Sequence, residues 1–286
     1  MKTQNFSSPV LVIGGTGKVG RRIAEQLKAR GIAVKIGARS ATPSFDWENR
    51  NTWSAALDGV TAAYISYYPD LAVPGAAEQI AAFAELAVKK GVRRLVLLSG
   101  RGEEGAERAE EALKHSGADW TIVRAAWFFQ NFSENFLIEP VLAGEVALPV
   151  GQILEPFIDA DDVAAVAVAA LTEDGHVGQL YEVTGPRLMR FADAIAEISS
   201  AAGREIAFHE ISIGDFEAAL RTDGLDDGLI ALLKELFEVL LDGRNAHLTN
   251  GVERALGRPP RDFADYARET AASGVWYADP ALSKQG

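Results

Sequence analysis

A glycine triplet near the N-terminus is the pattern in this sequence that most directly suggests chemistry. Gly14, Gly17 and Gly20 have the spacing G-x-x-G-x-x-G within the segment VLVIGGTGKVGRR. Gly14 allows a sharp turn, Gly17 lets a diphosphate approach the backbone, and Gly20 lets a helix pack closely on a sheet. The triplet therefore predicts a dinucleotide-binding loop, with a purely structural glycine turn as the alternative. The predicted loop also includes Thr16, Lys18 and Val19.

The residues after the second predicted strand indicate which dinucleotide binds. A site that prefers NAD usually carries Asp or Glu there, bound to the ribose 2′-hydroxyl. This chain instead has Arg39 and Ser40, and no acidic residue lies between Glu25 and Asp46. Because a guanidinium can bind a 2′-phosphate through two hydrogen bonds, with Ser40 assisting, the sequence favours NADP(H). The alternative is that Arg39 is a solvated loop residue.

Two further segments are expected near the cofactor. Asp46, beside Trp47, follows a very short candidate for a third strand and would flank the adenine. Tyr67, beside Tyr68, follows another predicted strand and would lie next to the cofactor. For both tyrosines, a turn or packing role is an equally good interpretation.

The catalytic pair of ordinary short-chain dehydrogenases is missing. They use Tyr-x-x-x-Lys, where the tyrosine donates a proton and the lysine lowers its pKa. None of the six tyrosines here is followed four residues later by Lys, and if Glu110 matches the usual downstream glutamate, the two positions are Gly102 and Ala106. Reduction of a ketone needs such an acid, whereas a quinone gives a far less basic phenolate. Ser99 is the best candidate donor to a developing oxyanion; alternatively it caps the next segment.

An aromatic segment, WTIVRAAWFFQNFSE, begins in the predicted strand 119–125 and continues beyond the carboxyl end of that strand. Trp127 and Phe128 could form a face on which a flat substrate stacks, although some of these aromatic residues, Phe129 and Phe132 included, must pack the protein itself. The amides of Gln130 and Asn131 are candidates for substrate contact or, alternatively, for hydrogen bonds to the loop backbone.

These candidate residues all follow strands in an alternating pattern of strands and helices. Such alternation predicts an α/β fold, a Rossmann-type doubly wound parallel sheet, and helical periodicity dominates from Phe191 onward. We expect an NADP-binding domain over residues 1–155, completed by 159–185, and a smaller, mainly helical substrate lobe over 186–286. The predicted strands are 9–13, 32–38, 60–66, 94–99, 119–125, 180–184 and, in the lobe, 205–208, and the main predicted helices are 76–90, 103–116 and 161–171.

Composition excludes several other classes of protein. The chain has 286 residues and no cysteine, which excludes disulfides and a thiolate nucleophile, and its four histidines lie far apart, so no metal site is expected. The net charge of −12 disfavours nucleic-acid binding. The polar opening Met1–Ser8 resembles neither a signal peptide nor an anchor, and Ala164–Leu171 is too short to span a bilayer. We therefore expect no membrane partner and a cytoplasmic location.

Several segments together resemble the NmrA-like atypical short-chain dehydrogenases. They are GGTGKVG, FDWENRNTWSAALDGV, LLSGRGEEGAERAEEALKHSGADWTIVRAAWFFQNFSE, FIDADDVAAVA and GRPPRDFADYA, which span nearly the whole chain. The resemblance implies a Rossmann domain with a smaller C-terminal lobe, an NADP(H) site at Gly14–Gly20 and Arg39, and a pocket near Ser99 and Trp127–Asn131. The missing Tyr/Lys pair agrees with this family.

Members of this family divide by function. Some resemble flavin-free NAD(P)H:quinone reductases, and in aromatic polyketide pathways similar proteins reduce an anthraquinone-type intermediate, sometimes for hydroxylation by a partner protein. The resemblance therefore implies an NADPH-dependent oxidoreductase of antibiotic biosynthesis, with a small aromatic substrate, a partner oxygenase or hydroxylation component, and room for an oligomer. The alternative is a non-catalytic NADP(H)-sensing regulator. Ala106 argues against the branch of ether and enone reductases that use a lysine base.

Overall fold

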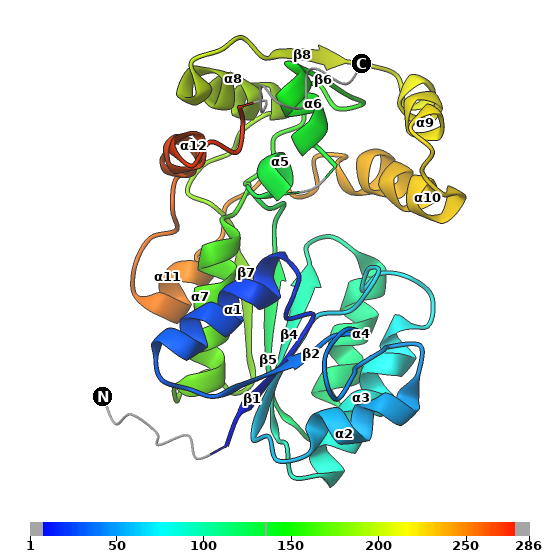
Figure 1. Ribbon diagram of the computed structural model, residues 1–286, viewed down its shortest axis with the longest axis vertical. Helices are drawn as coiled ribbons and strands as arrows, with labels where there is room; N and C mark the ends of the chain where they lie inside the picture. The colour runs from blue at the N-terminus through cyan, green and yellow to red at the C-terminus, as the bar shows by residue number, and fades with distance from the viewer. Residues whose placement is uncertain (1–7, 135, 278–286) are drawn as a thin grey trace. The chain divides into compact units, whose positions relative to one another are not determined.

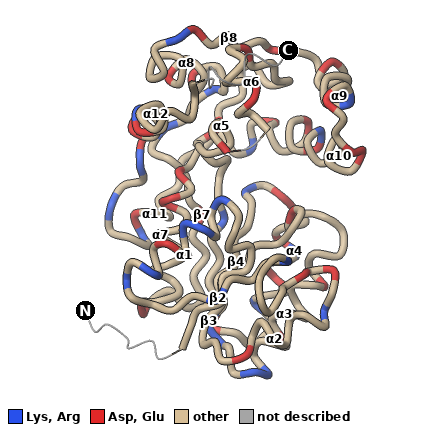
Figure 2. Tube along the Cα trace, in the orientation of Figure 1, with Lys and Arg blue, Asp and Glu red and all other residues tan. Residues whose placement is uncertain are grey.

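The computed structural model describes residues 8–134 and 136–277, which form two compact units. Unit 1 comprises residues 8–125, 160–183 and 249–259 of the described chain, and unit 2 comprises 126–159, 184–248 and 260–277. The polar N-terminal segment considered above lies outside the described residues except for Ser8. Along the described chain, Lys and Arg residues are interspersed with Asp and Glu residues (Figure 2). No helix among the described residues combines the length and the apolar character needed to cross a bilayer.

Unit 1 contains a six-stranded sheet in the order β2-β1-β3-β4-β5-β7, in which every neighbouring pair is parallel. The inner strands are short apolar runs that are buried on both faces, as expected for a parallel sheet covered by helices. This confirms the predicted Rossmann-type sheet. The strands are β1 (Val10–Ile13), β2 (Val34–Gly37), β3 (Ala62–Ile65), β4 (Arg94–Gly100), β5 (Asp119–Ala125) and β7 (Gln179–Val183).

Helices cover both faces of this sheet (Figure 1). On one face α7 packs against both α1 and α11, and almost every residue of α7 is buried, which explains its run of Ala and Val. On the other face α3 packs against α4. The helices of unit 1 are α1 (Lys18–Ala29), a 3-10 turn (Arg50–Thr52), α2 (Trp53–Leu57), α3 (Ala76–Lys89), α4 (Glu104–Lys114), α7 (Ala160–Thr172) and α11 (Gly251–Leu256).

Unit 2 is mainly helical and has an aromatic core. Its only sheet among the described residues is a parallel pair, β6 (Glu145–Leu148) with β8 (Ala207–Glu210). Phe132, Phe157, Phe191 and Phe263 pack together at the centre, with ring centroids 4.9 to 6.3 Å apart. The helices are α5 (Asn131–Glu134), α6 (Ile138–Ala143), α8 (Phe191–Ala202), α9 (Ile213–Thr222), α10 (Asp227–Glu235), a π-helical turn (Leu236–Leu240) and α12 (Phe263–Ala272).

The structure corrects three expectations. The short third strand before Asp46 is absent, because residues 38–47 form bends that send Phe45 and Trp47 into the core from a loop. Strand β6 was not predicted, and β8 begins two residues later than the predicted strand. The boundary between the units also differs, since residues 126–159 belong to unit 2 and residues 249–259 return to unit 1, where α11 packs on α7.

Candidate functional site

The glycine loop between β1 and α1 has the geometry that its sequence predicts. Gly14 has a φ of +69°, and its N–H donates to the Gly37 carbonyl at 2.8 Å. A Cβ on Gly20 would lie 2.1 Å from the Gly14 carbonyl oxygen, so only glycine fits where the helix crosses the loop. At Gly17 the nearest atom to an added Cβ is the same oxygen, at 3.2 Å. The loop thus leaves bare backbone at its turn, as a diphosphate requires.

The N-terminus of α1 is arranged to receive an anion. Gly17 is its N-cap residue and provides no side-chain cap, and the first turn contains no acidic residue. The first N–H groups of a helix have no partner within the helix, and together with the helix dipole they favour a bound phosphate. These features fit the diphosphate of a dinucleotide, which Gly14–Gly20 would hold through backbone N–H groups.

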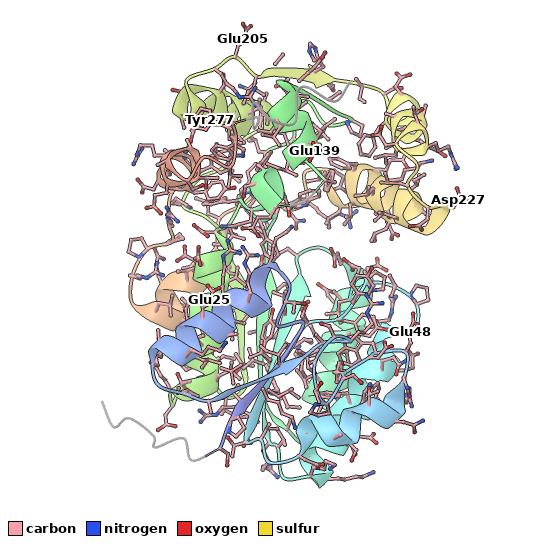
Figure 3. The ribbon with its side chains drawn as sticks, in the orientation of Figure 1. Glu25, Glu48, Glu139, Glu205, Asp227 and Tyr277 are labelled. Atoms are coloured by element: carbon pink, nitrogen blue, oxygen red, sulfur yellow. The ribbon has the colours of Figure 1, made fainter. Side chains whose placement is uncertain are left out.

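Arg39 and Ser40 lie exposed in the loop after β2. Among the described residues, the contact of the Arg39 guanidinium is with the ring of Tyr68, whose centroid lies 5.4 Å from Cζ. The acidic residue that precedes them in sequence, Glu25, is exposed on α1 (Figure 3). The two residues stand where the sequence placed them, at the end of the second strand, and their contact with a 2′-phosphate stays a prediction.

Asp46 and Tyr67 belong to a cluster that joins the loops after β2 and β3. The Asp46 carboxylate accepts a hydrogen bond from the Glu48 N–H at 3.1 Å. Trp47 packs against Tyr67, with ring centroids 4.9 Å apart, and donates through Nε1 to the Ser66 carbonyl at 3.0 Å. Burial, with a smaller effect of Glu48 (labelled in Figure 3), raises the pKa of Tyr67. Both predicted residues therefore have structural partners, and their contact with the cofactor stays a prediction.

Ser99, the candidate oxyanion donor, is held inside unit 1 by a charged network. Its hydroxyl donates to the Glu110 carboxylate at 2.6 Å. The same carboxylate accepts from Arg124 Nε at 2.9 Å and Nη2 at 2.6 Å, and these hydrogen bonds raise the pKa of Arg124. Because a serine hydroxyl has one proton, this arrangement directs it to Glu110 and leaves only oxygen lone pairs for another partner. The structure thus weakens the interpretation of Ser99 as an oxyanion donor.

The positions of the missing catalytic pair also have structural explanations. Ala106 is fully buried on α4, and Gly102 has a φ of +75° in the turn before this helix. A longer side chain at Ala106 would have to displace the core, and a tyrosine at Gly102 would be strained. The local fold therefore agrees with the absence of a Tyr/Lys pair.

A second ion pair at this edge of the sheet was missed in the sequence. Ser99, Arg124 and Glu182 are register neighbours on β4, β5 and β7, so their side chains lie on one face. Glu182 accepts a hydrogen bond from Arg101 at 2.7 Å, and Arg101 is buried. The only sequence signal for this pair is a charged residue near the end of each of two apolar strands.

The aromatic segment after β5 divides into two kinds of residue in unit 2. Phe129 and Phe132 are fully buried and pack on Phe263, whereas Trp127 and Phe128 are half-buried. Trp127 contacts rings from two distant segments, Phe191 and Phe237, both at 5.5 Å. Phe237 lies in the π-helical turn, a conformation that is frequent at functional sites. The helical periodicity around Phe237 did not reveal this contact.

The two amide residues of the segment, Gln130 and Asn131, lie in unit 2. Gln130 is buried and donates to the Asp159 carboxylate at 2.7 Å, and Asp159 also forms an ion pair with Arg261 at 3.0 Å. Asn131 begins α5, and its N–H donates to the Phe128 carbonyl at 3.1 Å. The Gln130 amide therefore serves the protein, whereas the role of the Asn131 amide and the contact of either residue with substrate stay predictions.

No group of three or more His, Asp or Glu residues that could hold a metal ion occurs among the described residues.

Comparisons with known proteins agree with a nucleotide-binding fold. Residues 14–174 match the model of the NAD(P)H-binding family. The chain is 30% identical over 287 residues to an NAD(P)H azoreductase of Xenophilus azovorans, covering 92% of this chain and 98% of the relative. It is 31% identical over 288 residues to a (4-alkanoyl-5-oxo-2,5-dihydrofuran-3-yl)methyl phosphate reductase of Streptomyces griseus, with the same coverage.

Solved structures show the same fold. The NADPH-dependent quinone oxidoreductase QOR2 of Escherichia coli, complexed with NADPH, superposes with a TM-score of 0.73 at 22% identity, covering 91% of this chain and 99% of that one. NmrA, a negative transcriptional regulator in complex with NAD, gives a TM-score of 0.70 at 14% identity, covering 94% and 98%.

The chain belongs to the NAD(P)H-binding family. Within it, the expected NmrA-like atypical short-chain dehydrogenase class is confirmed, and the protein is an NAD(P)H-dependent oxidoreductase.

Proposed function

We propose that this protein is a flavin-free, NADPH-dependent reductase that delivers a hydride to a quinone or a related conjugated aromatic carbonyl. The observation that carries the proposal is the absence of the Tyr/Lys pair from the two positions where ordinary short-chain dehydrogenases have it. The described part of the chain has alanine and glycine in place of the Lys and Tyr, and the Ser99 proton is directed to Glu110. A reductase that lacks a proton donor suits an acceptor that can take up a hydride without being protonated at the same time. A quinone is such an acceptor, because its reduced form is a weakly basic phenolate.

The cofactor, when bound, supplies the hydride, and the chain's own residues supply position and charge. The backbone of Gly14–Gly20 and the start of α1 would hold the diphosphate. Arg39, with Ser40, would hold the 2′-phosphate, because both residues are exposed in the loop after β2 and a guanidinium can bind a phosphate through two hydrogen bonds. Selection of NADPH over NADH follows from this arrangement.

The acceptor would contact unit 2 through Trp127 and Phe128. Both rings are only half-buried, unlike Phe129 and Phe132, so they retain surface for another flat molecule. Phe237, packed against Trp127, would fix the orientation of that ring. The similarity to an azoreductase, and the fold shared with a quinone oxidoreductase, support a planar conjugated acceptor. An anthraquinone-type polyketide intermediate, reduced in antibiotic biosynthesis before hydroxylation by a partner oxygenase, is the narrower form of the proposal.

The test is stopped-flow oxidation of NADPH with naphthoquinones, anthraquinones and an azo dye. We expect turnover with at least one quinone and no flavin requirement. The Trp127→Leu variant should raise KM for the quinone without changing the Kd for NADPH. Phe208→Leu, a substitution at another half-buried aromatic residue of unit 2, is the matched control. Turnover with the azo dye and with none of the quinones would contradict the quinone assignment and indicate an azo compound as the acceptor.

The second candidate is a non-catalytic sensor of NADP(H). The likeness of fold to NmrA and the absent acid pair favour it. A sensor would show no turnover with any acceptor while still binding NADP⁺ and NADPH. Such a result would overturn the enzymatic proposal and leave the cofactor site intact.

A further inference from the structure

Two exposed side chains meet across the end of strand β1. Arg39 follows β2 and Tyr68 follows β3, and the guanidinium carbon lies 5.4 Å from the centre of the tyrosine ring. In the sheet, β1 lies between β2 and β3. The contact therefore reaches across the carboxyl end of the strand that leads into the glycine loop.

Tyr68 does not serve to anchor its own loop. The neighbouring Tyr67 packs on Trp47 at 4.9 Å, and the Trp47 indole holds the Ser66 carbonyl at 3.0 Å. Tyr68 is 68% exposed, the largest exposed fraction of any large hydrophobic residue that the structure describes. An aromatic ring held in solvent against a single arginine indicates a role for that contact, because the fold gains little apolar burial from it.

The contact leaves the hydrogen-bonding edge of Arg39 available. A ring attracts the face of a guanidinium, whereas the N–H donors that bind a phosphate point outward in the plane of the group. Within the described chain, the contact of Arg39 is with this ring, and no ion pair of Arg39 with a carboxylate is found. A guanidinium stacked in this way loses rotational freedom before an anion arrives, which lowers the cost of a bidentate contact.

We propose that Tyr68 is a positioning residue that sets the selectivity for NADPH over NADH by stacking on Arg39 and orienting its edge toward the 2′-phosphate. This inference rests on the proposed NADPH site and extends it to a residue outside the glycine loop. It needs the aromatic face of Tyr68 and not its hydroxyl. It also predicts that the contribution of Tyr68 disappears when Arg39 is removed.

The test is isothermal titration calorimetry of the full chain with NADPH, NADH and 2′,5′-ADP. Tyr68→Ala should raise the Kd for NADPH and for 2′,5′-ADP by about two- to fivefold, the range of an exposed cation–π contact, and leave the Kd for NADH unchanged. Tyr68→Phe should bind all three ligands like the unmodified protein, whereas Tyr68→Leu should behave like Tyr68→Ala. In an Arg39→Ala background, Tyr68→Ala should cause no further loss.

Three results would overturn the inference. The first is an equal loss of affinity for NADPH and NADH in Tyr68→Ala. The second is a loss of NADPH affinity in Tyr68→Phe as large as in Tyr68→Ala, and the third is that the losses of NADPH affinity in the Arg39→Ala/Tyr68→Ala double variant are additive. Circular dichroism verifies folding, which an exposed residue should not disturb. Because 2′,5′-ADP carries no nicotinamide, its binding does not depend on hydride transfer. A failure of quinone reduction is thus distinguishable from a failure of this inference.

Discussion

The network of Ser99, Glu110 and Arg124 permits a quantitative prediction about stability. Glu110 is 1% exposed and accepts three hydrogen bonds, two of them from Arg124, whose side chain is 18% exposed. Glu110→Gln keeps the shape and removes the charge, so the ion pair left to Arg124 within the described structure is the longer one to Glu107, at 3.5 Å. Breaking a buried ion pair costs about 3–5 kcal/mol. Because water and Glu107 reach Arg124, we expect about 3 kcal/mol.

The assay is urea unfolding followed by circular dichroism, with stability taken from the midpoint and slope of the transition. Glu111→Gln is the matched control, because Glu111 is the next residue on α4, is 58% exposed and forms an ion pair with Lys114 on the same helix. An exposed pair of this kind contributes less than about 1 kcal/mol. The two substitutions remove the same charge from the same helix and differ in burial.

A double-mutant cycle separates the ion pair from other effects of the substitutions. Replacing both Glu110 and Arg124 by Met removes the two charges together and leaves neither unpaired. We expect the double variant to be about 2 kcal/mol more stable than the sum of the single losses predicts. The reasoning fails if Glu110→Gln loses no more stability than Glu111→Gln, or if the two Met substitutions are additive.

Three further predictions concern other parts of unit 1. Gly17→Ala should fold normally, because its Cβ meets only one oxygen at 3.2 Å, but should bind NADPH weakly in calorimetry. Gly20→Ala should instead unfold the loop, because its Cβ would lie 2.1 Å from the Gly14 carbonyl oxygen. Equal behaviour of the two variants would contradict the role of the glycine loop as a diphosphate site. Tyr64→Phe should leave thermal stability unchanged or raise it, because the buried hydroxyl, with the Ser66 side chain as a polar neighbour, forms no hydrogen bond of normal geometry in the described structure; a clear loss of stability would contradict this. Burial lowers the pKa of His176 from its usual 6.5, so the unfolded chain takes up this proton first as the pH falls below that value, and stability declines. His176→Gln should reduce this decline in urea titrations between pH 7 and pH 5, and an unchanged pH profile would refute it.

The glycine loop could be predicted because every requirement is local in the sequence. Gly14, Gly17 and Gly20 lie within one strand–turn–helix segment, and Arg39 follows at the end of the next strand. Strand β5 was predicted with its bounds, Asp119–Ala125, for the same reason. Periodicity describes elements of this kind well, since their burial pattern repeats along the chain.

The charged network could not be predicted, because it depends on the register of separate elements. Arg124 meets Ser99 through the pairing of β5 with β4, and it meets Glu110 through the packing of α4 on the sheet. A one-residue change of register would put Arg124 on the other face. Periodicity also does not tell where a helix packs. The last hundred residues were interpreted as one lobe, yet a Cβ on Gly251 of α11 would lie 2.1 Å from the Glu182 carbonyl of β7.

The way unit 1 uses its charges narrows the chemistry. Two ion pairs, Glu110–Arg124 and Glu182–Arg101, lie near the carboxyl ends of β4, β5 and β7. An arginine does not release a proton near neutral pH, and the hydrogen bonds to Glu110 raise the pKa of Arg124 further. These pairs join neighbouring elements of unit 1 and offer no group that would give up a proton readily. Under the proposed function, the acceptor would therefore take up a hydride before any proton, which a quinone does and an isolated ketone does not.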